Sequence, residues 1–307
     1  MAIGTRWLHA LLVMVVGFGS LLSATGASAH QRQDEDGRIA FVRGNQIYTM
    51  TAMGRSVTRL TSAGKNYGPQ WSPDGRQISF IRERRDGSRD VWVMNATGGR
   101  KRAITTTGDV TSVSASWSPD GTTLAYAAGA LHMISTRPGS APTRPSGYES
   151  NSWCAPDPLE AIPVDRYLAW SPDGSTIALY NRYDCYFDYA MWWFRPETGE
   201  AYQYRALGAD CCGYAEWSDL FYGPTGEFGY SERDGGDYGE TYGPRLIVYP
   251  GFASRPGDAG GAPSPSGRFM AFSNDASGTP FVMRANIDGT DRRRLTVGYQ
   301  PDWQPGR

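Results

Sequence analysis

Histidine is nearly absent from this sequence of 307 residues, and lysine is rare. The three histidines are His9, His30 and His132. General-base catalysis needs a positioned partner and metal centres often use histidine, so this scarcity argues against both kinds of site. Acidic and basic residues nearly balance, at 31 and 30, with a formal net charge of −1. A general nucleic-acid binder normally carries a basic excess, and we therefore expect no nucleic-acid partner.

Long apolar runs are also missing, except at the N-terminus. Arg6 precedes an apolar stretch over residues 7–22, and the small-x-small pattern Ala27-Ser28-Ala29 follows. This order is typical of a secretory signal peptide, so we predict that residues 1–29 are the signal and that cleavage follows Ala29. An uncleaved membrane anchor is the alternative, but glycine and serine interrupt a run already short for a bilayer span. We expect an exported protein, periplasmic or extracellular, that does not span a membrane after cleavage.

The remaining composition favours one large all-β domain. About 278 residues follow the cleavage site, and the whole chain holds 38 glycines and 20 prolines. Such a composition suits many short strands and turns better than long helices. We expect a short N-terminal segment over residues 30–36 and a single domain over residues 37–307.

A pentapeptide, WSPDG, recurs along the chain and precedes an apolar strand each time. Three copies lie at residues 71–75, 117–121 and 170–174, and degenerate copies lie at residues 223–226, 264–267 and 303–306. Proline fits position i+1 of a type I turn, serine fits i and glycine fits i+3, so the motif predicts a tight hairpin. The preceding tryptophan would lie in an inner strand and bury its ring between adjacent sheets.

Each full unit predicts two further strands after the hairpin, as in residues 91–94 and 102–105. Four strands per unit, at a spacing of 40 to 53 residues between the motifs, is what the blade of a β-propeller requires. Residues 38–62 look like the last three strands of a blade, and residues 299–306 supply the missing inner strand and turn. The sequence therefore predicts a six-bladed propeller whose ring is closed by pairing of its two ends. A linear solenoid is the alternative.

The repeats WSPDG-x2-IxF and VWVMNATGG-x3-AITT resemble the propeller repeats of the TolB-like family over about residues 37–307. The resemblance implies a six-bladed propeller and says little about function. TolB carries an α/β domain ahead of its propeller, whereas here the propeller begins within about ten residues of the expected cleavage site. We expect that domain to be absent, and a role in outer-membrane integrity is not carried over. Peptidases also use this repeat, but no hydrolase segment follows here.

The unusual insertions are expected on one face, where the second-to-third-strand loops and the blade connections of such a propeller meet. They lie at residues 139–165, 181–189, 209–214 and 231–243. All four cysteines fall within them, at Cys154, Cys185, Cys211 and Cys212. In an exported protein this favours disulfides, with Cys211 and Cys212 each pairing with one of Cys154 and Cys185. A strained bond between the adjacent pair, or a metal-thiolate site without the usual spacing, is the alternative.

Two features of these loops could bind a partner. Aromatic side chains surround the cysteines and suit stacking on sugars or packing against a protein. The candidate ligand-binding residues are Trp153, Tyr183, Tyr186, Tyr189, Tyr214 and Tyr238. An acidic, glycine-rich stretch contains Asp234, Asp237 and Glu240, which are weak candidates for a calcium site. The competing interpretations are that the rings cover the loops and that the acidic stretch is a solvated hairpin.

No catalytic constellation emerges from the sequence. His132 lies in the apolar stretch 131–134 and is expected to be a packed strand residue rather than a base. Asp74, Asp120 and Asp173 belong to turns rather than to an acid/base pair, and we expect no cofactor. The sequence favours a monomeric, non-catalytic binding or scaffold protein that recognises a protein or a cell-envelope glycan through its loop-rich face. The alternative is a polysaccharide lyase or hydrolase in the propeller channel, with carboxylates or tyrosines replacing histidine.

Overall fold

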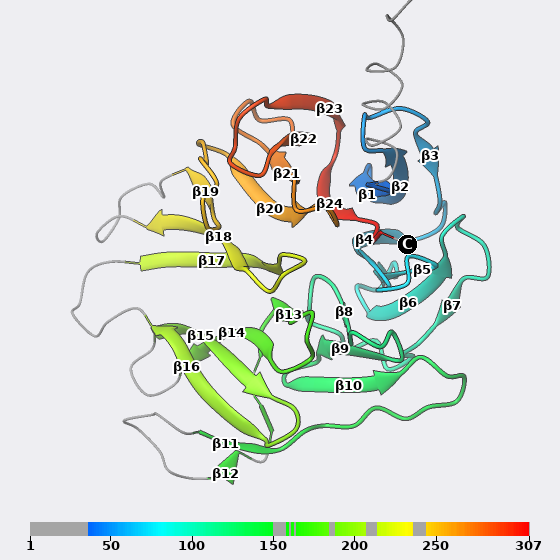
Figure 1. Cartoon of the computed structure of the whole chain (residues 1–307). Coiled ribbons are helices and arrows are strands. Elements are labelled where there is room, and N and C mark those ends of the chain that lie inside the picture. Colours follow the sequence, from blue (N-terminus) through cyan, green and yellow to red (C-terminus); the bar gives the residue numbers. More distant parts are fainter. Residues whose placement is uncertain are drawn as a thin grey trace, which may run out of the picture.

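A computed structural model describes residues 36–149, 158–159, 161–162, 164–183, 188–206, 214–235 and 244–306. These residues contain 24 strands, arranged as six sheets around a common centre (Figure 1). The all-β, six-bladed propeller predicted from the repeat is therefore confirmed. Among the described residues, no helix is long and apolar enough to cross a membrane. The expected signal peptide and its cleavage after Ala29 lie outside the described residues.

Blades 1, 2 and 6 have the expected four strands. Blade 1 contains β24 (Tyr299–Trp303), β1 (Arg38–Arg43), β2 (Gln46–Thr51) and β3 (Thr58–Arg59). Blade 2 contains β4 (Lys65–Trp71), β5 (Gln77–Glu83), β6 (Arg89–Asn95) and β7 (Arg102–Ala103). Blade 6 contains β20 (Asp258–Pro263), β21 (Phe269–Asn274), β22 (Phe281–Asn286) and β23 (Arg293–Val297).

The other three blades differ in the number of strands that the structure describes. Blade 3 contains β8 (Ser116–Trp117), β9 (Thr123–Ala127) and β10 (Leu131–Ser135), with a single bridge in place of a fourth strand. Blade 5 contains β17 (Tyr214–Tyr222), β18 (Phe228–Gly235) and β19 (Arg245–Val248). Blade 4 contains β13 (Leu168–Trp170), β14 (Ile177–Tyr183), β15 (Asp188–Arg195), β16 (Glu200–Ala206), β11 (Gly147–Glu149) and β12 (Pro158–Leu159).

The extra strands of blade 4 come from the 139–165 insertion, which we expected on the loop-bearing face. Instead, β11 pairs in parallel with β16 on the outside of the blade, and Tyr148 N–H donates to Gly199 O at 2.9 Å. Gly199 belongs to the turn between β15 and β16, at the opposite end of the blade from the β14–β15 loop. The predicted position of this part of the insertion was therefore wrong, because the free edge of β16 offers backbone partners that a loop lacks.

The two ends of the chain close the ring, as predicted. Strand β24 pairs antiparallel with β1, with Ile39 opposite Trp303 and Val42 opposite Tyr299. Beyond the strand, Gln304 N–H donates to Arg38 O at 2.8 Å. One sheet thus contains both the first and the last described strands, and Figure 1 shows them side by side.

The core lies between neighbouring blades, and the motif tryptophans fill it. Trp71, Trp117 and Trp303 are each buried in a cluster that joins two sheets. Trp303, for example, stacks on Phe269 of blade 6 with 6.4 Å between ring centroids and 10° between the ring planes. The repeated large ring fixes the spacing of the blades, which is the role expected from its place before the turn.

The turn itself has the predicted geometry. Gly75 N–H donates to Ser72 O at 2.8 Å, and Ser72 Oγ donates to the Asp74 carboxylate at 2.6 Å. The copies at residues 118–121 and 171–174 repeat both bonds. Hydrogen bonds from Ser118 and from Thr122 lower the pKa of Asp120, so this carboxylate stays ionised and holds the turn. The interpretation of these aspartates as turn formers is confirmed.

Candidate functional site in the central channel

The six inner strands β4, β8, β13, β17, β20 and β24 surround a cavity of about 430 Å³ to which every blade contributes. One end is lined by the prolines of the turn motifs, namely Pro73, Pro119, Pro172, Pro224, Pro265 and Pro305. Five residues earlier in each repeat, the lining consists of Gly68, Ser114, Tyr167, Asp219, Gly260 and Gln300. The channel is therefore apolar at the turn end and polar deeper inside.

The polar level of the channel coincides with β-bulges in the inner strands. The pairing register shifts in four of the six, between Tyr67 and Gln70 in β4 and at the equivalent points of β17, β20 and β24. The bulged residues have positive φ, and two of them are not glycine: Asp219 at 51° and Gln300 at 50°. A left-handed non-glycine residue costs on the order of 1–3 kcal/mol and is a feature of functional sites.

Side chains in the channel satisfy the free backbone edges of neighbouring inner strands. The Asp302 carboxylate accepts a hydrogen bond from Trp71 N–H at 2.6 Å, and Ser116 Oγ accepts one from Trp170 N–H at 2.9 Å. Deeper in the channel, Gln300 Oε1 accepts a hydrogen bond from Gly68 N–H at 3.0 Å. Each bond joins one blade to the next, so these side chains hold the ring together from the inside.

Blade 5 breaks this pattern. Phe221 occupies the position that Asp302 and Ser116 hold in other blades, and the next blade presents Pro263, which has no N–H to satisfy. Added Cβ atoms at Gly229 and at Gly261 would each lie 2.4 Å from the Phe221 ring. Both glycines are therefore required to accommodate this ring, and one sector of the channel wall is aromatic rather than polar.

Two channel carboxylates have perturbed acidities. Burial raises the pKa of Asp302 to about 7, although the N–H groups of Trp71 and Trp303 partly oppose this effect. Burial also raises the pKa of Asp219, against the opposing charge of Arg245. Tyr167 lines the same cavity, and burial followed by the charge of Asp219 raises its pKa to about 12. A carboxyl group that titrates near neutrality can exchange protons, but one oxygen of Asp302 is already committed to the backbone.

The repeat alignment did not single out Asp219, Asp302 or Gln300. The available signal was the unusual residue type at each place. Asp302 stands where other blades have glutamine, serine, alanine or phenylalanine, and Asp219 and Gln300 stand where two blades have glycine. His132 is the strand residue that we expected. It lies on β10 opposite Tyr126, with 3.3 Å between Nδ1 and the tyrosine oxygen. Burial, followed by the charge of Arg144, lowers its pKa.

The structure places only part of the predicted loop-face site. Tyr183 ends β14, Tyr189 lies in β15 and Tyr214 begins β17, so their backbones lie at the loop ends of the neighbouring blades 4 and 5. Asp234 lies in β18, opposite Ala215. The other predicted residues, Trp153, Cys154, Cys185, Tyr186, Cys211, Cys212, Asp237, Tyr238 and Glu240, lie outside the described residues, as do the disulfides. The described part of the chain contains no group of three or more metal-ligating side chains.

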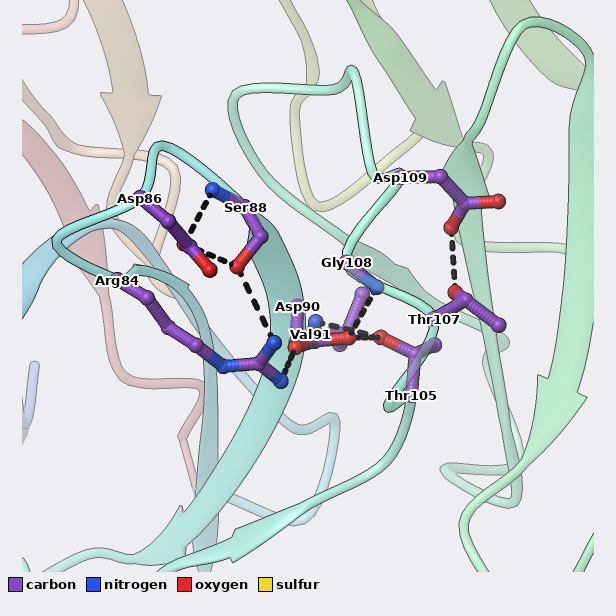
Figure 2. A network of polar contacts seen from close by, with 9 residues as sticks. All are labelled: Arg84, Asp86, Ser88, Asp90, Val91, Thr105, Thr107, Gly108 and Asp109. Atoms are coloured by element: carbon purple, nitrogen blue, oxygen red, sulfur yellow. Dashed lines mark hydrogen bonds and ion pairs between the residues drawn. The ribbon is translucent and has the colours of Figure 1, made fainter.

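The same face of blade 2 is closed by an internal polar network (Figure 2). The fully buried Asp90 binds Arg84, accepts a hydrogen bond from Thr105 Oγ1 at 3.0 Å and accepts another from Gly108 N–H at 3.1 Å. Thr105 Oγ1 in turn accepts a hydrogen bond from Val91 N–H at 3.0 Å. These groups satisfy one another, so this network is structural and leaves little free bonding capacity for a ligand.

Comparisons with known proteins agree with this architecture. Residues 38–139 match the family model described as the TolB beta propeller domain. The chain is 33% identical over 75 residues to the "Tol-Pal system protein TolB 1" of Novosphingobium aromaticivorans, covering 24% of this chain and 16% of that protein. It is 35% identical over 71 residues to the "Uncharacterized peptidase YuxL" of Bacillus subtilis, covering 23% and 11%. The matches thus span less than a fifth of these relatives.

The crystal structure of TolB from Acinetobacter baumannii superimposes with a TM-score of 0.65 at 16% identity, covering 89% of this chain and 67% of that one. This likeness extends the agreement from the matched repeats to nearly the whole ring. Fold and repeat sequence therefore point the same way: residues 38–139 match the TolB beta propeller domain, and the described ring has the six-bladed fold seen in TolB.

Proposed function

We propose that this chain is an exported, non-catalytic binding protein that recognises a protein or a cell-envelope glycan through the loop-bearing face of blades 4 and 5. The observation that carries the proposal is the length of the strands there. With 9, 8 and 8 residues, β17, β18 and β15 are the longest described strands. Long hairpins in neighbouring blades extend a rigid support for the loops that they carry, and such loops commonly bind partners.

The residue types at the loop ends of these blades support a partner of the protein class. Two candidate aromatic residues, Tyr189 and Tyr214, lie at the loop ends of the long strands β15 and β17, and a third, Tyr183, ends the neighbouring β14. Tyrosine is enriched in the energetic centres of protein interfaces. One matching relative is named as a protein of the Tol-Pal system, which also favours a protein partner. We propose a monomer in the periplasm or outside the cell, with the signal removed after Ala29 and the four cysteines joined as disulfides.

A capture experiment tests this proposal. The mature chain is immobilised under non-reducing conditions and exposed to solubilised native cell envelope and to purified envelope glycan. One variant lacks residues 236–243, beyond the end of β18, and a second carries Tyr186→Ala and Tyr189→Ala. Tyr148→Ala is the matched control, because Tyr148 is an exposed tyrosine on β11, outside β16 in blade 4.

We expect both loop-face variants to lose a reproducible partner by about tenfold in affinity, the cost of one or two interface anchors. The Tyr148→Ala control should retain it. Equal retention of every partner by all the variants would show that this face does not bind.

The channel supports a second candidate function, a lyase or hydrolase acting on a polysaccharide. The observation that favours it is a cavity containing Asp302, whose pKa of about 7 suits an acid/base group, together with Asp219 and Tyr167. A screen of polyuronides and neutral glycans, with and without calcium, tests it. Turnover that disappears in Asp302→Asn and Asp219→Asn would establish an enzyme, whereas no turnover across the panel leaves binding as the function.

A further inference from the structure

An unusual group of aromatic side chains packs between blades 4 and 5, and none of them lines the channel. Trp193 on β15, Tyr202 and Tyr204 on β16, and Phe228 on β18 form what we call the aromatic strip. The rings of Trp193 and Tyr204 stack with 4.3 Å between centroids and 22° between planes. Phe228 meets Tyr204 edge-on at 5.6 Å. Trp193 lies beside the turn between β15 and β16, so the strip begins at the turn end of the blade.

A β-bulge presents the strip. Met191 lies opposite Arg205 and Trp192 lies opposite Gln203, so Tyr204 is an additional residue in β16. A bulge changes the direction of a side chain and is common beside functional sites. Here both Tyr204 and Arg205 reach blade 5, where Arg205 binds Tyr230 and Glu232. In a regular strand these two neighbours would face opposite sides of the sheet.

Tyr204 is rigid and yet accessible. It retains 45% of its surface exposed, although Trp193 covers one face of its ring and Phe228 meets its edge. The indole N–H of Trp193 is buried and finds no acceptor among the described residues. A buried donor without a partner costs on the order of 1–3 kcal/mol. Tyr204 is thus held between Trp193 and Phe228 with nearly half of its surface open to solvent.

Two half-exposed ion pairs frame the strip. Arg195 and Glu200 lie at the turn end, with the Arg195 guanidinium 4.9 Å from the Tyr202 ring centroid. Arg205 and Glu232 lie at the other end, 3.3 Å apart, with Trp217 Nε1 donating to Glu232 at 2.9 Å. Each pair is neutral overall, and each guanidinium retains further N–H donors. From Glu200 to Arg205 the strip spans roughly 16 Å at about 3.3 Å per residue.

We propose that the aromatic strip is a binding site for a neutral oligosaccharide. A pyranose ring has a face of C–H groups, which suits the exposed tyrosine ring, and hydroxyl groups at its edge, which suit arginine donors and carboxylate acceptors. Flat rings with a neutral ion pair at each end match a sugar chain in both respects. A charged polysaccharide would instead call for an excess of one charge.

The size of the surface also favours a sugar over a docked protein. A stable protein interface buries about 800 Å² on each partner, whereas Tyr204 is the one strip residue among the exposed large apolar side chains. Leu246 and Val248 of β19 extend the blade 5 wall, opposite Glu232 and Tyr230. They add a short apolar edge on blade 5 rather than a second broad face. This site goes beyond the proposed function, because it uses none of the loop-face residues.

Titration with three neutral hexasaccharides (cello-, malto- and chitohexaose) tests the site by calorimetry and by intrinsic tryptophan fluorescence. The full mature chain is compared with Tyr204→Ala, Tyr204→Phe and Tyr148→Ala, each first checked for native circular dichroism. Tyr148 is the control because it is equally exposed, at 48%, and lies on the same blade. We expect at least one sugar to bind the wild type and to bind Tyr204→Ala about tenfold more weakly.

Tyr204→Phe keeps the ring and should bind within about twofold of the wild type, as should Tyr148→Ala. Deletion of residues 236–243 should leave sugar binding intact, so failure here is distinguishable from failure of the loop-face proposal. The inference is overturned if none of the hexasaccharides binds, or if Tyr204→Ala binds as tightly as the wild type. It is also overturned if Tyr204→Ala abolishes capture of a protein partner while sugar binding is unaffected.

Discussion

At the scale of the residue, Asp302 is the clearest case of one side chain serving the whole ring. Its carboxylate caps the backbone of the neighbouring blade at Trp71 from within a poorly solvated channel. A protonated carboxyl group can still accept that hydrogen bond, and it avoids the cost of a buried charge. The equivalent residue in blade 3 is Ser116, whose hydroxyl accepts the hydrogen bond from Trp170 N–H without an ionisable group.

The acidity of Asp302 gives a stability prediction. In the folded protein the pKa of Asp302 is about 7, whereas the ordinary pKa of an aspartate carboxyl group is 3.8. The native state therefore binds more protons between these values, and the free energy of unfolding falls as pH rises from about 4 to 7. At about 1.4 kcal/mol per pKa unit the loss is at most about 4 kcal/mol, and less where water enters the channel.

Asp302→Asn keeps an acceptor for Trp71 and removes the titration. Denaturant unfolding from pH 4 to pH 8 should show the variant gaining stability over the wild type as pH rises. A constant difference between the two proteins across this range would mean that Asp302 does not titrate there.

At the scale of the element, the bulges of the four bulged inner strands impose different demands in different blades. Gly68 and Gly260 occupy equivalent positions with φ of 58° and 64°. A Cβ at Gly68 would lie 1.9 Å from Val113 O, whereas the nearest atoms to a Cβ at Gly260 are 3.9 Å away. The two glycines thus share a left-handed backbone conformation, but only Gly260 has room for a side chain.

Alanine substitutions at these glycines separate the two effects. Gly260→Ala should lose about 1 kcal/mol, the cost of a left-handed alanine. Gly68→Ala adds a backbone clash with blade 3 and should lose at least about 3 kcal/mol in chemical denaturation. Equal losses in the two variants would show that blade 3 shifts freely away from β4.

The sequence predicted the elements well wherever a local rule decides the conformation. The Ser-Pro-Asp-Gly turns, the buried motif tryptophans and the strand identity of His132 follow from turn chemistry and ring size alone. The pairing of β11 with β16 could not be predicted from the sequence, because a free strand edge pairs with whichever segment lies nearby in the fold. The channel carboxylates and the aromatic strip were missed for a similar reason. The contacts of Asp302, Tyr204 and Phe228 are with residues on other blades, which the sequence of one repeat does not reveal.

At the scale of the whole molecule, the ring is closed by one strand pair that joins the two ends of the chain. The other blade interfaces are joined covalently by the continuous chain, whereas blade 1 is held by the hydrogen bonds between β1 and β24. Opening the ring at this blade means breaking that ladder and exposing Trp303. An unpaired β1 would also present a free strand edge to other molecules.

A circular permutant tests this closure. A short Gly-Ser linker joins residue 306 to residue 36, and new termini are placed between Ser62 and Ala63, so that blade 1 becomes continuous. The ring is then closed by side-chain packing between blades 1 and 2, without a strand pair. We expect a folded monomer with a nearly unchanged free energy of unfolding, because the permutant keeps the β1–β24 hydrogen bonds. It should unfold faster in denaturant jumps, because the ring can open between blades 1 and 2 without breaking a strand ladder. A linker of the same length inserted in the wild-type order, between Ser62 and Ala63, is the control and should leave both quantities nearly unchanged. Identical unfolding rates for permutant and wild type would mean that packing between blades, rather than the β1–β24 ladder, limits opening of the ring.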